Sequence, residues 1–210
     1  MDHHTSSAAP FRRPPSADGF SRRGFLKAGA AAGGGLMLSL SLPFGDDKTK
    51  AADAFVPNAF IRIDRDGQIF LTMPYVEMGQ GTYTSISMLI AEELEVDLKQ
   101  VQPEHAPPNE KLYANPLLGV QATGNSNAIR GAWQPLREAG ATARTMLVSA
   151  AAKRWNVDPS SCRAQSGEVL HMPTGRRLKY GELAADAAHM PVPAKVALKR
   201  PDDFKLIGTR

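Results

Sequence analysis

The sequence predicts an α+β fold in which a β-hairpin and a small mixed sheet pack against two main helices. Three observations support this prediction. Apolar and polar residues alternate on both sides of Asp66-Gly67, as they do in a hairpin. Apolar residues recur at helical spacing after Thr82 and again after Ser126. Short alternating segments between residues 162 and 180 then predict further strands beyond the second helix.

The composition is that of an ordinary globular protein. Of the 210 residues, 42% are hydrophobic and 22% are charged, which excludes a collagen-like chain and wholesale disorder. The net charge is only +4, and no basic run carries interleaved aromatic residues, so no nucleic-acid partner is expected. The single cysteine, Cys162, excludes an internal disulfide and a cysteine-bound zinc or iron–sulfur centre. We expect Cys162 to be an inert buried thiol.

Residues 1–54 have the features of a twin-arginine signal peptide. Arg22-Arg23 precede an apolar stretch from Ala28 to Leu42, and Ala52-Asp53-Ala54 supplies a small-residue cleavage site. A membrane anchor is disfavoured, because spanning a bilayer takes about 20 strongly apolar residues, whereas this stretch contains four Gly and two Ser. We therefore expect recognition by the twin-arginine translocase and a periplasmic location for the folded protein.

The first half of the mature chain predicts a hairpin, a helix and an edge strand. The hairpin strands are Ala59–Asp64 and Gln68–Met73, joined by Arg65-Asp66-Gly67. The helix begins at Thr82 and ends near Glu95, with an apolar stripe at Ile86, Leu89, Ile90 and Leu94. Val101–Glu104 is predicted as a short edge strand, because proline is tolerated only at such positions.

The second half predicts a long loop, a long helix and a small meander. His105–Ala122 has no periodicity, although its tail Leu117–Val120 is apolar enough that we expect it to be packed. The helix extends to about Trp155, with Pro135 bending it or marking the end of its first turn. The meander strands and final elements are Cys162–Gln165, Glu168–His171, Arg177–Tyr180, a helix over Gly181–Ala188 and an extended Lys195–Arg210.

Two glycine loops stand immediately before the two main helices. They are Met78-Gly79-Gln80-Gly81-Thr82 and Thr123-Gly124-Asn125-Ser126. Glycine lets the backbone approach a ligand closely, and the first N–H groups of a helix attract a phosphate. The structural alternative is a pair of tight turns, with Thr82 and Ser126 capping their own helices. Neither loop fits the Walker or the dinucleotide-binding glycine pattern.

Other polar and aromatic residues favour structural roles. Three histidines lack metal-ligand spacing and are expected at the surface or hydrogen-bonded: His105, His171 and His189. Three glutamates at the end of the first helix are expected to form a solvated face: Glu92, Glu93 and Glu95. Three aromatic residues are expected in the core: Tyr75, Trp133 and Trp155. No nucleophile elbow for Ser/His/Asp catalysis is present in the sequence.

The first glycine loop carries a family resemblance. Glu77-Met78-Gly79-Gln80-Gly81-Thr82, followed by Ala91-Glu92-Glu93-Leu94, resembles the molybdopterin-binding motif of the molybdenum hydroxylases, the relatives of xanthine dehydrogenase and aldehyde oxidase. The order of motifs is similar to that of the large subunit of isoquinoline 1-oxidoreductase type enzymes: leader, Phe55–Phe60, Met-Gly-Gln-Gly, Leu112–Pro116 and Ala122–Ser126.

The resemblance implies a cofactor, partners and site residues. The family holds molybdenum in a molybdopterin, often joined to a cytidine nucleotide. It hydroxylates an N-heterocycle or an aldehyde with water-derived oxygen and passes electrons to a small iron–sulfur subunit. By similarity, Met78, Gly79, Gln80, Gly81 and Thr82 contact the pterin and metal region, and Thr123, Gly124, Asn125 and Ser126 contact the phosphate or the pterin.

The resemblance also shows what this sequence departs from. The family's catalytic glutamate, in a Gly-x-Gly-Glu context, has no counterpart before Arg210, and Ala128 replaces a hydroxyl residue. Residues 55–210 are therefore expected to be the N-terminal part of a larger molybdopterin-binding domain, inactive without the remainder of the large subunit. The alternative is an exported, non-catalytic fragment that binds an anion or a cofactor.

Overall fold

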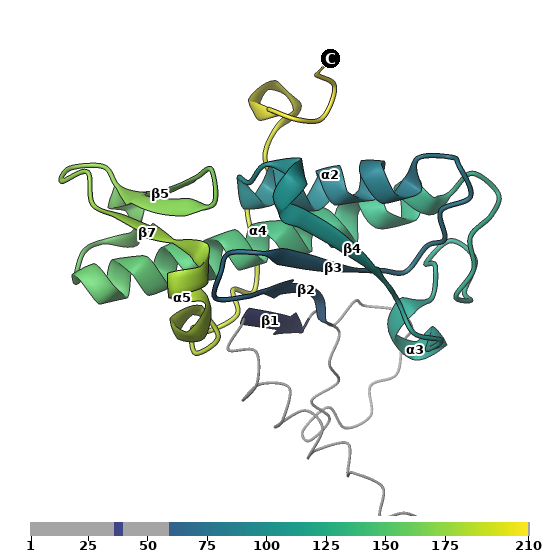
Figure 1. The fold of residues 1–210 in the computed structure, drawn as a ribbon, viewed down its shortest axis with the longest axis horizontal. Coiled ribbons are helices and arrows are strands. Elements are labelled where there is room, and N and C mark those ends of the chain that lie inside the picture. The colour runs from purple at the N-terminus through teal and green to yellow at the C-terminus, as the bar shows by residue number, and fades with distance from the viewer. Residues whose placement is uncertain (1–35, 40–58, 210) are drawn as a thin grey trace, which may run out of the picture. The chain divides into compact units, whose positions relative to one another are not determined.

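The computed structural model describes residues 36–39 and 59–209, which form two sheets and several helices (Figure 1). A four-stranded sheet has the order β1-β2-β3-β4, and a three-stranded sheet has the order β5-β6-β7. The predicted signal peptide lies outside the described residues, except for the short strand β1, Leu36–Ser39. No helix among the described residues is long and apolar enough to cross a membrane. The α+β prediction is confirmed.

The predicted hairpin is formed by β2, Ala59–Ile63, and β3, Ile69–Met73. The two strands are antiparallel, with Ile61 opposite Leu71. The turn places Gly67 at φ +87°, a conformation that favours glycine. Alternate residues of β3 are buried, which is why its sequence alternates.

Helix α2, Thr82–Leu94, connects β3 to the edge strand β4, Val101–His105. β4 pairs with β3 in parallel, and Pro103 lies opposite Leu71. This β3-α2-β4 crossover carries the first glycine loop at the exit of β3. The edge position of β4 is confirmed, whereas its parallel direction did not follow from the sequence.

The long loop after β4 contains one short helix, α3, Glu110–Tyr113. Tyr113 is buried and contacts Phe60 edge to face, with 5.8 Å between ring centroids. The prediction that Leu117–Val120 would be packed is wrong for the described residues: Leu117, Leu118 and Val120 are exposed. The apolar character of this segment therefore does not serve the core of the described chain.

Helix α4, Ala128–Trp155, has 28 residues and continues through Pro135, so this proline does not mark the end of a first turn. Figure 1 shows α2 and α4 lying side by side, and their backbones approach closely at Gly140. A Cβ atom there would lie 2.9 Å from the Cβ of Glu93 and 3.2 Å from the Ile90 carbonyl oxygen. Glycine is therefore required by the helix contact rather than by a turn.

The remaining elements confirm the predicted meander and short helix. They are β5, Cys162–Gln165; β6, Glu168–His171; β7, Arg177–Lys179; and α5, Tyr180–Ala187. The segment after α5 has only a 3-10 turn, Pro201–Asp203, as regular structure. One core joins the hairpin, α2, α4, the meander and α5, and its largest fully buried side chain is Tyr180.

Candidate functional site

The two glycine loops, which are far apart in sequence, meet in the structure. The Val76 N–H, at the start of the first loop, donates to Thr123 Oγ1 in the second loop across 2.8 Å. Val76 is placed by the exit of β3, and Thr123 by the end of the long loop that precedes α4. The hydrogen bond therefore joins the crossover to the start of the second main helix.

The first loop is closed by its own glutamate. Glu77 Oε1 accepts the N–H groups of Gly79 at 2.7 Å and Gly81 at 3.0 Å, and Oε2 accepts that of Tyr83 at 2.9 Å. The Tyr83 N–H contributes most to holding the pKa of the Glu77 carboxyl below its ordinary value; burial opposes this, and the glycine N–H groups add to it. The chain's own carboxylate therefore occupies the N–H groups of Gly79, Gly81 and Tyr83, so these three groups are not open to a ligand phosphate.

Gln80 also bonds within the first loop. Its Oε1 accepts the Met78 N–H at 2.5 Å, and its Nε2 donates to the Val76 carbonyl at 2.8 Å. Each amide atom keeps further hydrogen-bonding capacity, because the oxygen has two lone pairs and the nitrogen two hydrogens. Met78 is held beside it with 68% of its surface exposed. Gln80 and Met78 are thus fixed by the loop yet remain accessible.

The second loop turns sharply into α4. Asn125 and Ser126 both adopt left-handed backbone conformations, at φ +54° and +50°. The buried Asn127 then forms the N-cap position and accepts a hydrogen bond from Asn115 Nδ2 at 2.7 Å. The predicted caps are wrong: the N-cap positions are Gly81 and Asn127, and neither helix has a side-chain cap of the predicted kind. The first turn of α4 is therefore uncapped by side chains, unlike the α2 N-terminus, which Glu77 serves.

A pocket of about 470 Å³ lies between the two loops. Of the nine residues expected at a ligand, the pocket is lined by Met78, Gln80, Thr82, Thr123, Gly124, Asn125 and Ser126. Gly79 and Gly81 are not in its lining, because their N–H groups turn to Glu77. Ser85 and the start of α4, Asn127–Ile129, complete the wall. The pocket offers amides, hydroxyls and backbone N–H groups, which suits a ligand rich in hydrogen-bonding groups.

Comparison with known proteins identifies the family of this chain. Residues 21–206 match the family model described as the molybdopterin cofactor-binding domain. The chain belongs to this family. More specifically, it is homologous to the molybdopterin-binding large subunit of molybdenum hydroxylases, and the resemblance inferred from the loops is confirmed.

Curated relatives of this molybdopterin-binding domain are longer than the chain. It is 40% identical over 169 residues to the isoquinoline 1-oxidoreductase beta subunit of Brevundimonas diminuta, covering 79% of the chain and 22% of that protein. It is 30% identical over 200 residues to the membrane-bound aldehyde dehydrogenase (pyrroloquinoline-quinone) of Gluconacetobacter polyoxogenes, covering 90% of the chain and 25% of that protein. The chain thus spans about a quarter or less of the length of these relatives.

A solved structure is also similar to part of the domain. Quinoline 2-oxidoreductase from Pseudomonas putida 86 matches with a TM-score of 0.48 at 21% identity. The match covers 69% of this chain and 19% of that one.

Three residues that shape the two loops of this molybdopterin-binding domain were not predicted to have a role, and of these only Asn127 lines the pocket. Glu77 was quoted only as part of the motif, while Asn115 and Asn127 lay in segments assigned to a loop and a helix. Asn115 has 1% of its surface exposed and Asn127 2%. Asn115 and Asn127 lie 12 residues apart in the sequence, so their pairing becomes apparent only in the folded chain. The one sequence signal for this pairing is that both asparagines lie in the same glycine- and proline-rich segment.

The glutamates at the end of α2 correct another prediction, because they are not a solvated face. Glu93 is fully buried and pairs with Arg137 at 2.7 Å and with Arg144 at 3.3 Å. Glu92, 1% exposed, accepts the N–H groups of Lys205, Leu206 and Ile207. These carboxylates hold the C-terminal segment of the described chain against α2.

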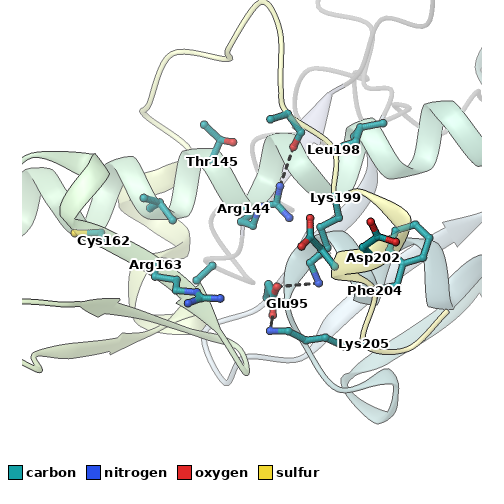
Figure 2. A pocket seen from close by; sticks show the side chains of 14 residues that line it. Glu95, Arg144, Thr145, Cys162, Arg163, Leu198, Lys199, Asp202, Phe204 and Lys205 are labelled. Carbon is teal, nitrogen blue, oxygen red and sulfur yellow. Dashed lines mark hydrogen bonds and ion pairs between the residues drawn. The ribbon is translucent and has the colours of Figure 1, made fainter. Parts of the chain in front are cut away.

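A second pocket, of about 720 Å³, lies beside this segment (Figure 2). In Figure 2 the Lys199 and Lys205 side chains converge on Glu95, at 2.8 and 2.6 Å. Cys162 lies in its lining, free and partly exposed rather than buried as expected. Three of the charged side chains that line this pocket, Glu95, Lys199 and Lys205, pair with one another and attach the C-terminal segment to the end of α2.

The three histidines singled out in the sequence make hydrogen bonds within the chain. His105 Nδ1 bonds the Tyr83 hydroxyl at 2.8 Å, His171 Nδ1 bonds Thr174, and His189 Nδ1 bonds the Ala185 carbonyl. Across the described part of the chain, no three His, Cys, Asp or Glu residues are grouped to hold a metal ion.

Two of the aromatic residues expected in the core differ in their exposure. Tyr75 is buried, and burial raises its pKa to about 12. Trp133 is 36% exposed, so the expectation that it lies in the core is wrong.

Proposed function

We propose that this chain forms one wall of the cofactor site in the large subunit of a molybdenum hydroxylase. The observation that carries the proposal is the Val76–Thr123 hydrogen bond, which brings two distant loops to one pocket in a domain of this family. When bound, the molybdenum–molybdopterin cofactor supplies the chemistry that hydroxylates an electron-poor carbon with oxygen from water. The chain's own residues bind and orient that cofactor.

The lining of the pocket fits such a group. Gln80 offers an amide with spare donor and acceptor capacity at one side, where it would contact the pterin and metal region. Thr123, Asn125 and Ser126 offer polar groups at the other side, next to the uncapped first turn of α4. Unpaired N–H groups at a helix N-terminus attract an anion, so this side would hold the phosphate. The molybdopterin is proposed in its plain or its cytidine-linked form.

The reaction of the whole enzyme needs partners beyond this segment. The relatives are named as the beta subunit of isoquinoline 1-oxidoreductase, a nicotinate dehydrogenase subunit and a membrane-bound aldehyde dehydrogenase. These names support an N-heterocycle or an aldehyde as the proposed substrate class. The family resemblance supports a small iron–sulfur subunit as the proposed electron acceptor. The sequence holds no Gly-x-Gly-Glu, so the catalytic glutamate is assigned to the remainder of the large subunit.

Residues 1–54 are proposed to act as a twin-arginine signal peptide. The paired arginines ahead of a glycine-rich apolar stretch are the feature that supports this assignment. Export in the folded state suits a protein that acquires its cofactor before translocation. The mature protein is therefore proposed to work in the periplasm.

The molybdenum content of the purified protein tests the binding proposal. The full-length protein is produced together with its iron–sulfur subunit in a host that makes molybdopterin, and metal is measured by mass spectrometry. Stoichiometric molybdenum is expected, with a marked loss on Gln80→Ala and none on Thr84→Val, a change at an exposed site on α2. A folded protein without molybdenum would overturn the enzyme assignment and leave an exported, non-catalytic binding fragment.

A further inference from the structure

We propose that Glu77 is a positioning residue that shapes the first cofactor loop. Its carboxylate holds residues 78–81 in the conformation that presents Met78 and Gln80 to the pocket. Glu77 lines no part of the pocket itself, so its effect is exerted through the loop. The inference rests on the proposed cofactor site and deepens it.

Three N–H groups converge on this one carboxylate. Gly79 and Gly81 donate to Oε1, and Tyr83 donates to Oε2, all at 3.0 Å or less. Both glycines are in the left-handed region, at φ +95° and +78°, which turns their N–H groups inward. Backbone N–H groups that point at one position form an anion-binding concavity. The chain fills that concavity with its own anion.

The same carboxylate completes the start of α2. Gly81 is the N-cap position and Tyr83 lies in the first turn, and α2 has no acidic residue in that turn and no side-chain cap at Gly81. A helix N-terminus leaves N–H groups without intrahelical partners and favours a negative charge nearby. From a position shortly before the helix, Glu77 accepts the Tyr83 N–H and places a negative charge at the α2 N-terminus.

Gln80 depends on this arrangement. Its side chain spans the loop, from the Met78 N–H to the Val76 carbonyl, and these two atoms lie on either side of Glu77 in sequence. Gln80 lies between Gly79 and Gly81, so if the N–H groups of these glycines lose their acceptor, the backbone that carries Gln80 is no longer held. We therefore expect the orientation of Gln80 to be lost together with the Glu77 contacts.

Amide hydrogen exchange on the full-length protein without cofactor tests whether Glu77 holds the loop. Glu77→Gln removes the charge and, because the amide nitrogen accepts nothing, leaves one oxygen for three donors. Exchange at Gly79, Gly81 and Tyr83 is expected to rise about tenfold, the size of one lost charge-assisted hydrogen bond. Unchanged exchange at these amides would overturn the inference.

Molybdenum content then tests whether the held loop matters for the cofactor. In the protein coexpressed with its iron–sulfur subunit under limiting cofactor, Glu77→Gln is expected to lose molybdenum several-fold. The control is Glu104→Gln, which neutralises an exposed carboxylate on β4 with a single 3.5 Å contact to Arg62. Faster exchange with full molybdenum retention contradicts the positioning role.

Two measures keep the result interpretable. Thermal unfolding shows whether Glu77→Gln folds; if it does not, Glu77→Asp, which keeps the charge on a shorter side chain, is expected to show a smaller rise in loop exchange. Absence of molybdenum from the unmodified protein rejects the proposed function. The exchange measurement without cofactor would still decide whether Glu77 holds the loop, so the two failures are distinguishable.

Discussion

At the scale of single residues, the carboxylates of this chain act by accepting backbone N–H groups. Glu77 closes the first glycine loop, and Glu92 binds three consecutive N–H groups of the C-terminal segment. Charge-assisted hydrogen bonds of this kind are stronger than neutral ones. Burial of Glu92 by itself would raise the pKa of its carboxyl, but the Lys199 ammonium and the N–H groups outweigh burial and lower that pKa.

The lowered pKa of Glu92 predicts an acid-sensitive contact. A carboxyl whose pKa is lower in the folded state contributes stability above its ordinary pKa, and this contribution disappears as the pH falls through the folded value. Glu95, whose pKa burial also tends to raise, is likewise lowered overall by Lys199 and Lys205. We expect thermal unfolding to change little between pH 7 and 5 and to shift to lower temperature below about pH 4.5.

The variant Glu92→Gln isolates this contribution. At pH 7 it is expected to unfold at lower temperature than the unmodified protein, and the difference is expected to shrink as the pH falls. Hydrogen exchange of residues 205–207 reports directly on the contact. A difference between the two proteins that is constant from pH 7 to pH 3 would show that the ionised carboxylate is not what holds the segment.

At the scale of elements, the contact between α2 and α4 decides the packing around Glu93. The two backbones come close enough that Gly140 has no space for a side chain. At the same crossing, the buried Glu93 meets Arg137 and Arg144 from α4. Removing one partner of a buried ion pair leaves an uncompensated charge. The close approach at Gly140 and the ion pairs of Glu93 therefore both fix how α2 and α4 align along each other.

Gly140→Ala tests the close approach. Alanine favours a helix by about 1 kcal/mol over glycine, but the new methyl group would lie 2.9 Å from Glu93 Cβ. Overpacking costs about 1–3 kcal/mol, so a net loss in the free energy of unfolding is expected in denaturant titrations. Gly124→Ala is the control, because nothing lies within 4 Å of its Cβ position. An increase in stability for Gly140→Ala would show that the helices can separate at no cost.

At the scale of the whole molecule, the fold brings two loops of similar sequence together and gives them different roles. The first loop is closed by Glu77, while the second leaves the first turn of α4 without a side-chain cap. The Val76–Thr123 hydrogen bond joins them, at the edge of the pocket. Residues from both loops thus line one pocket.

Thr123→Val tests this junction. Valine keeps the shape of threonine but cannot accept the Val76 N–H, and a lost hydrogen bond costs about 1 kcal/mol, or about fivefold in affinity. Lower molybdenum occupancy is expected under limiting cofactor, with little change in thermal unfolding. Thr123→Ser, which retains the hydroxyl, is expected to restore occupancy. Full occupancy in Thr123→Val would show that the loops are positioned independently of this bond.

The sequence by itself determined the local elements and the location of the loops. Alternation predicted β2 and β3, helical spacing predicted α2 and α4, and the glycine motif indicated the cofactor family before any geometry was known. These features are readable because they depend on residues close together in the chain.

Only the tertiary structure decided which groups meet across the chain. Glu93 lies on the same helix end as Glu95, and a pattern of charges there is typical of a solvated surface. Its burial depends on Arg137 and Arg144 of another helix, more than 40 residues away. The same holds for Val76 and Thr123, whose hydrogen bond spans 47 residues. A buried polar group is stable only with its partner, and the identity of a distant partner is a property of the folded chain.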